Sequence, residues 1–131
     1  LGPDELERYA QLQREHANLR AALEFCLTEP GEQRAGLDIG AALWSYWFVS
    51  CSHTEGRYWL RQALEANPEP SPARAKALWV NASLAVMQAD TAVGRSMARE
   101  CRRMAQRLGD ESALAHLTRV TGVATFWRVR S

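Results

Sequence analysis

The side chains that could carry out chemistry are the three histidines and three cysteines: His16, His53, His116, Cys26, Cys51 and Cys101. Cys51 and His53 are two residues apart, but a metal site needs at least two further ligands, and no C-x-x-C or H-x-x-x-H spacing supplies them. Each cysteine falls in an apolar stripe, where buried thiols are inert. No set of nucleophile, base and orienting group can be assembled. We therefore expect no enzyme activity, no metal and no cofactor, with His16 packed within its own helix and His53 in a turn.

Arginines are concentrated in one predicted helix near the C-terminal end. We call this set the arginine ridge: Arg95, Arg99, Arg102, Arg103 and Arg107. Only Glu100 opposes it, so the ridge could bind a phosphate, a nucleotide or an acidic partner. The alternative is the solvated face of an amphipathic helix. Because no aromatic side chains are interleaved with the arginines, we expect no direct DNA binding.

Composition indicates an ordinary globular domain. The chain has 131 residues, 47% of them hydrophobic, and a net charge of +1, which gives no general attraction to nucleic acid or acidic membranes. The odd number of widely spaced cysteines argues against a disulfide scaffold and predicts a cytoplasmic protein. Arginine is used almost to the exclusion of lysine, since Lys76 is the single lysine, and this usage is typical of a GC-rich bacterial genome. No run is apolar enough to span a membrane.

The elements that must position these side chains are predicted to be helices, organised around the stretch from Ala41 to Leu64. Apolar residues recur there at steps of three and four, first at Trp44, Trp47 and Phe48, and then, after a polar break, at Gly56, Trp59 and Leu60. This spacing predicts two helices folded back on each other, with Gly56 permitting a close approach.

Capping residues and apolar stripes predict the remaining helices. Six are expected, over about residues 4–29, 33–51, 54–66, 72–89, 91–108 and 111–130. Asp4 is expected to cap the first helix, and Ser71 the fourth, with Pro72 at its first position. Asp90 is expected to cap the fifth helix and Gly109 to close it.

An internal repeat links two of these helices. Gly56-Arg57 and Gly94-Arg95 each lie just inside the second helix of a pair, and they are separated by 38 positions, a period typical of stacked helix pairs. Each pair cannot bury its apolar face alone, so neighbours must share a core. The residues expected to form that core are Trp44, Trp47, Gly56, Trp59, Leu60, Ala82, Gly94 and Cys101.

A resemblance to tetratricopeptide-type repeats is carried in the first repeat by Leu43, Trp47, Gly56, Leu60, Ala63 and Pro68, and in the second by Leu78, Ala82, Ala85, Gly94, Ala98 and Cys101. Trp44 stands where that motif has a small residue, Ala85 stands where it has an aromatic one, and the spacing exceeds the usual 34 residues. A resemblance that covers more of the chain is carried by three segments, EHANLRAAL from Glu15, ALW from Ala42 and EGRYWL from Glu55. They are similar to the helical-repeat region of LuxR-type bacterial signal-transduction ATPases. The resemblance implies a sensing role beside an ATPase and a helix-turn-helix in the same regulator, and it implies no catalytic residue here.

In arrays of this kind the first helix of each pair lines the concave face. Register places there Asp38, Ala41, Ser45, Phe48, Lys76, Trp79, Ser83 and Val86. A tryptophan beside a lysine and a serine suits a protein or peptide partner, or a small effector. The alternative is that Trp79 only packs against the preceding hairpin.

The sequence thus predicts an all-α fold of stacked antiparallel helix pairs in one domain. Its parts are a leading helix (1–30), two repeats (31–70 and 71–109) and the first helix of an incomplete repeat (110–131). We expect the chain to belong to a longer cytoplasmic transcriptional regulator. A free-standing adaptor and an Arg-rich phosphate or nucleic-acid binder are the alternatives. The unpaired last helix, with Val123, Phe126 and Trp127, could also pair with a second copy.

Overall fold

The computed structural model describes residues 2–49 and 53–119, with the exception of a few side chains that include Trp44 and Ser45. The expectations for Cys51, Val123, Phe126 and Trp127 lie outside these residues. The elements are α1 (Pro3–Thr28), α2 (Gln33–Ala42), α3 (Trp44–Val49), α4 (His53–Ala66), α5 (Pro72–Met87), α6 (Thr91–Leu108) and a last helix over residues 111–119. The described residues form helices and loops without a strand, so the predicted all-α fold is confirmed.

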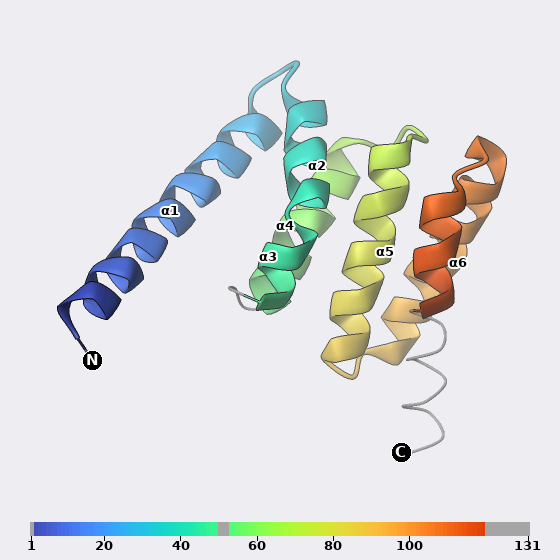
Figure 1. Cartoon of the computed structure of the whole chain (residues 1–131). Coiled ribbons are helices and arrows are strands. Elements are labelled where there is room, and N and C mark those ends of the chain that lie inside the picture. Colours follow the sequence, from blue (N-terminus) through green and yellow to red (C-terminus); the bar gives the residue numbers. More distant parts are fainter. Residues whose placement is uncertain (1, 50–52, 120–131) are drawn as a thin grey trace.

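The helices are arranged as stacked antiparallel pairs. In Figure 1, α2, α5 and the helix of residues 111–119 stand side by side in front, and α4 and α6 lie paler behind them. One pair is α2–α3 with α4, and the next is α5 with α6. Neighbouring pairs also touch, because α5 packs on both α2 and α4. The leading helix α1 packs on α2 and α4 and leans away from the array toward its N-terminus.

Local sequence signals fix several helix ends. The Ser71 hydroxyl accepts a hydrogen bond from the Arg74 amide at 3.0 Å, as expected of the residue that caps α5. Gly109 ends α6 in the left-handed conformation with φ 66°. The expectation for α1 was wrong by two residues, since Gly2 is its cap and Pro3 its first residue. Pro3 lacks an amide hydrogen and is suited to that position.

The helix predicted over residues 33–51 is interrupted, which corrects the sequence analysis. Leu43 separates α2 from α3, and the indole N–H of Trp47 donates a buried hydrogen bond of 3.0 Å to the Gly40 carbonyl. Carbonyl groups in the last turn of a helix have no partner within it. The indole therefore satisfies one of these groups at the place where α2 ends.

Two glycines set how closely the paired helices approach. A Cβ atom added to Gly56 would lie 3.0 Å from Cδ1 of Leu84 and 3.1 Å from Cβ of Trp47. One added to Gly94 would lie 2.8 Å from Cγ2 of Val86. Gly94 thus faces α5, the first helix of its own pair, whereas Gly56 lies between Trp47 of its own pair and Leu84 of α5 in the next pair. A side chain at either position would force the neighbouring side chains to shift.

The core is centred on α5, which is buried on most of its circumference. This follows from its place between the first pair on one side and α6 and the helix of residues 111–119 on the other. Of the residues expected in the core, Trp59 is partly buried and the others with described side chains are buried: Trp47, Gly56, Leu60, Ala82, Gly94 and Cys101. None of the described helices combines the length and apolar character that a bilayer crossing requires.

Ion pairs join the second helices of the two pairs to each other and the leading helix α1 to the first pair. Arg57 on α4 donates to Asp90, the cap residue of α6, at 2.8 Å. In the same way Arg20 on α1 donates to Glu55 in the first turn of α4. In both contacts a carboxylate lies at the N-terminus of a helix, where the helix dipole favours negative charge. An arginine from another helix then binds that carboxylate.

We predict that Gly94→Ala lowers the free energy of unfolding by about 1–2 kcal/mol, because overpacking against Val86 outweighs the gain in helix propensity. The matched control is Gly40→Ala, where the nearest atom, Cδ2 of Leu60, is 3.7 Å from the added Cβ. That variant should gain about 0.5–1 kcal/mol. Urea denaturation of both proteins measures the difference, and an equal response would contradict the close approach at Gly94.

Asn81 gives a second prediction, because its side chain is buried and neither Nδ2 nor Oδ1 has a partner among the described atoms. An unsatisfied buried amide destabilises a fold by about 1–3 kcal/mol. Asn81→Leu, which has a similar branched shape, should therefore raise the thermal midpoint seen by calorimetry. A lower midpoint would show that a buried water molecule satisfies the amide.

Candidate functional site

A groove runs between α5 and the helix of residues 111–119, on the face where the first helices stand side by side. We call it the α5 groove. Its volume is about 330 Å³, and it is lined by Pro72, Ala73, Lys76, Trp79, Asp110, Ser112, Ala113 and His116. Its two walls belong to successive helix pairs, because α5 opens one pair and residues 111–119 follow the end of α6. The walls are therefore held in place by the packing between pairs.

A stacked pair of rings forms the floor of this groove. The Trp79 and His116 rings are nearly parallel, at 10°, with centroids 4.1 Å apart. Trp79 is 6% exposed, so most of the indole belongs to the core and only a small part of it lines the groove. His116 Nδ1 is 2.7 Å from the Ser112 carbonyl oxygen. Because a carbonyl can only accept, Nδ1 carries the hydrogen, and Nε2 is the nitrogen that remains to bind a ligand.

Charged groups stand at the side of the stacked rings. Lys76 contributes an ammonium group from α5, and the Asp110 carboxylate accepts the Ala113 amide at 3.1 Å. Asp110 is thereby tied to the start of its helix, whereas Lys76 is half-buried on the groove wall. The groove thus combines an ammonium donor, an imidazole nitrogen and part of an aromatic ring. This set of groups suits a carboxylate attached to an apolar or aromatic body.

The other residues predicted on the concave face lie in different surroundings. Asp38 is exposed and forms an ion pair with Arg34 one helical turn away, at 3.2 Å. Ser83 donates to the Trp79 carbonyl at 2.8 Å. Val86 is buried against Gly94, and Phe48 is half-buried with its ring edge toward His53. Among the described members of the predicted set, Lys76 and Trp79 line the α5 groove.

A cluster of polar side chains around Glu55 was missed by the sequence analysis. Arg20 donates to the Glu55 carboxylate at 2.9 Å, His16 at 3.0 Å and the Trp59 indole at 3.3 Å. The other nitrogen of His16 is hydrogen-bonded to the Tyr46 hydroxyl. His16 therefore contacts α3 and α4 rather than packing within its own helix, which corrects the expectation for this residue. Tyr46 and Glu55 are 30 and 39 residues from His16, and Arg20 is 35 residues from Glu55, so no local pattern could have indicated these contacts.

Electrostatics fix the charge state of the cluster. The Arg20 guanidinium, and then the Trp59 and His16 hydrogen bonds, lower the pKa of Glu55 from 4.5 to about 2, against the opposing effect of burial. The carboxylate is therefore ionised throughout the physiological range. It fastens α1 to α4 and, through His16 and Tyr46, to α3. We call the cluster of His16, Arg20, Tyr46, Glu55 and Trp59 the latch, because it holds the leading helix α1 against the array.

The described cysteines are buried. Cys101 donates a hydrogen bond to the Ala75 carbonyl at 3.2 Å, and burial raises the pKa of its thiol to about 12. A thiol with this pKa stays protonated at neutral pH and is a poor nucleophile. Cys26 is also buried. Within residues 2–49 and 53–119, no three histidine, cysteine, aspartate or glutamate side chains are placed to hold a metal ion.

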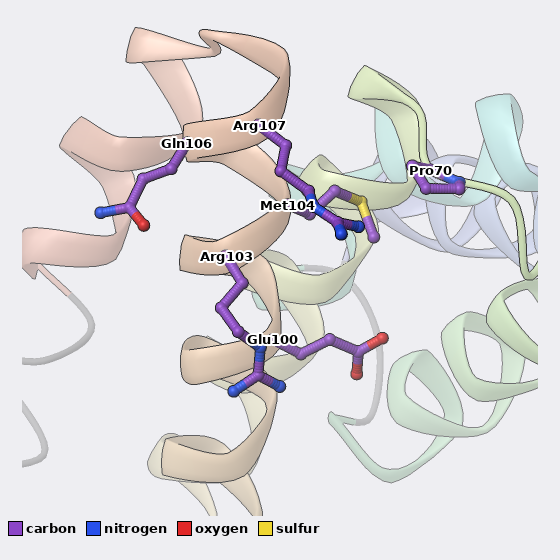
Figure 2. Close-up of a pocket in the computed structure, with 6 residues that line it drawn as sticks. All are labelled: Pro70, Glu100, Arg103, Met104, Gln106 and Arg107. Atoms are coloured by element: carbon purple, nitrogen blue, oxygen red, sulfur yellow. The ribbon is translucent and has the colours of Figure 1, made fainter.

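A second depression adjoins the arginine ridge, at the junction of α6 with the loop before α5. It has a volume of about 620 Å³ and is lined by Pro70, Glu100, Arg103, Met104, Gln106 and Arg107. In Figure 2, Met104, Arg107 and Glu100 extend from α6 toward the side where Pro70 lies, whereas Gln106 points the other way. The lining of this depression therefore combines two arginines one turn apart, Arg103 and Arg107, with the thioether of Met104.

No protein-family model, curated protein or solved structure matches this chain. The similarity to LuxR-type regulators and to tetratricopeptide-type repeats remains a prediction from the sequence segments that carry it. The geometry defines the class of the molecule as an array of stacked helix pairs.

The latch gives a prediction about acid stability. The pKa of Glu55 is lower in the folded state than in the unfolded state, so its contribution is complete above about pH 4.5 and is lost as the pH falls toward 2. Glu55→Gln should lower the free energy of unfolding by about 1–2 kcal/mol at pH 7 and have little effect near pH 2.

Urea denaturation across this pH range measures the effect. Glu65→Gln, at an exposed position on the same helix, is the control. A constant difference between wild type and Glu55→Gln at every pH would show that the carboxylate has an ordinary pKa.

Proposed function

We propose that this chain is a non-catalytic interaction segment, which binds a protein, a peptide or a small effector in the α5 groove and serves a bacterial transcriptional regulator as its sensing part. The observation that carries the proposal is the convergence of Lys76, Trp79 and His116 on one groove between two helix pairs. These groups bind and orient an anionic, partly apolar ligand, and they need no chemical step to do so.

The position of the groove supports a sensing role. Its walls are α5 and the helix of residues 111–119, which belong to different pairs. A ligand that contacts both walls has a higher affinity for one relative orientation of the pairs than for others. Binding energy that differs between two orientations shifts the population toward the preferred one. In a regulator, this shift would bias the modules attached to the array.

Peptide selection tests the binding part of the proposal. Peptides would be selected from a random library on the purified chain, and their affinities measured for Lys76→Glu and His116→Ala. We expect each substitution to weaken the selected peptides about ten-fold, because the ligand loses a charge-assisted hydrogen bond or part of the groove wall. Circular dichroism and thermal midpoints would establish that both variants remain folded.

The matched control is Arg61→Glu, which makes the same change of charge at an exposed position of α4. Peptides that bind Lys76→Glu, His116→Ala and Arg61→Glu equally well would place recognition outside the α5 groove and overturn this assignment.

The proposal that the chain belongs to a transcriptional regulator has a separate test, which is to sequence the whole reading frame that encodes the chain. We expect the same frame to encode a nucleotide-binding ATPase module and a helix-turn-helix, as the resemblance implies. A frame with neither module would favour the free-standing adaptor. This result would leave the groove proposal standing, so the two parts fail independently.

A further inference from the structure

The arginine ridge lies on the side of α6 that faces away from the core. The buried residues of α6 are Gly94, Ala98, Cys101, Met104 and Ala105, whereas the ridge arginines are exposed except Arg95, which is half-buried. Helix α6 carries five arginines and one glutamate, a net charge of +4, although the whole chain has a net charge of +1. The rest of the chain is therefore acidic, and positive charge is gathered on one outward face.

The arrangement of the ridge works against the stability of α6. Arg95, Arg99, Arg103 and Arg107 recur every four residues, and like charges at this spacing repel one another. Within the described part of the chain, none of these four guanidinium groups has an ion-pair partner. The carboxylate nearest in sequence, Glu100, is instead bonded to Arg74 of α5 at 3.0 Å. The internal structure thus leaves the charge of the four groups uncompensated.

The depression beside the ridge adds an apolar contact to this charge. Its lining combines the guanidinium-bearing Arg103 and Arg107 with Met104 and Pro70 (Figure 2). Arg74 holds Glu100 at the edge of the depression and is itself fixed by bonds to the Leu64 and Asn67 carbonyls, at 2.7 and 2.8 Å. The depression is therefore built on a rigid junction between α6 and the loop after α4. Among the described residues, its lining includes no aromatic side chain on which a base could stack.

We propose that the outer face of α6 is a docking surface for an acidic helical segment of a protein partner. Positions four residues apart are about 6 Å apart along a helix axis, so carboxylates repeated every fourth residue on a partner helix match the four arginines in spacing. An apolar side chain next to these carboxylates fits the depression over Met104. This surface is on a different helix from the α5 groove and does not depend on the proposed function.

Binding of a designed peptide tests the proposal. The probe is a fluorescent alanine-based helix of about 20 residues with glutamate at every fourth position and one leucine beside them. We expect salt-sensitive binding to the intact chain, measured by fluorescence anisotropy. Arg99→Glu combined with Arg103→Glu should weaken it about ten-fold or more, since each reversal replaces an attraction with a repulsion.

The matched control is Arg8→Glu combined with Arg14→Glu, which makes the same change of charge at exposed positions of α1. This protein should bind the peptide within about two-fold of the original, as distant exposed charges are screened. Equal losses in both double variants, or no binding to the intact chain, would overturn the proposal. So would tighter, Arg99- and Arg103-dependent binding of a DNA duplex of equal charge, which would identify the ridge as a nucleic-acid surface.

Discussion

The close approach of paired helices at Gly56 and Gly94 is the constraint on which the rest of this structure depends. Both glycines lie in the first turn or two of the second helix of a pair. Gly94 contacts the first helix of its own pair, and Gly56 contacts both α3 of its own pair and α5 of the next. These contacts set the distance at which the remaining side chains interlock. The two glycines are 38 residues apart and hold corresponding places in two pairs that stack through α5. The α5 groove exists because this stacking places the next helix alongside α5.

Polar contacts add defined geometry to the packing between successive elements, which is otherwise apolar. Arg57 reaches from α4 to the cap of α6, and Arg20 reaches from α1 to the first turn of α4. Each of these contacts joins segments more than 30 residues apart. Apolar surfaces tolerate sliding, since their attraction has little directional preference, but a guanidinium–carboxylate pair has a defined geometry. These pairs therefore select one orientation among several that would bury similar areas.

Much of the fold could be predicted from local sequence, because helix ends depend on neighbouring residues. Ser71 and Pro72 begin α5, and Gly109 ends α6, for reasons contained within a few positions. The interruption at Leu43 was not indicated by the apolar period, which continues from α2 into α3, although the Trp47 indole is hydrogen-bonded to the Gly40 carbonyl where α2 ends. The same limit applies to the sites. Repeat register singled out Lys76 and Trp79, but His116 comes from a later helix, and only the packing between pairs brings its ring onto Trp79.

The stacking of the Trp79 ring on the His116 ring limits how α5 and the helix of residues 111–119 can move relative to each other. A small tilt of one pair relative to the next would have to slide or separate two flat surfaces in contact. Such a joint resists bending toward either side while permitting rotation in the plane of the rings. Rotation in the plane of the rings is therefore the motion by which a ligand in the α5 groove could change the relative orientation of the two pairs.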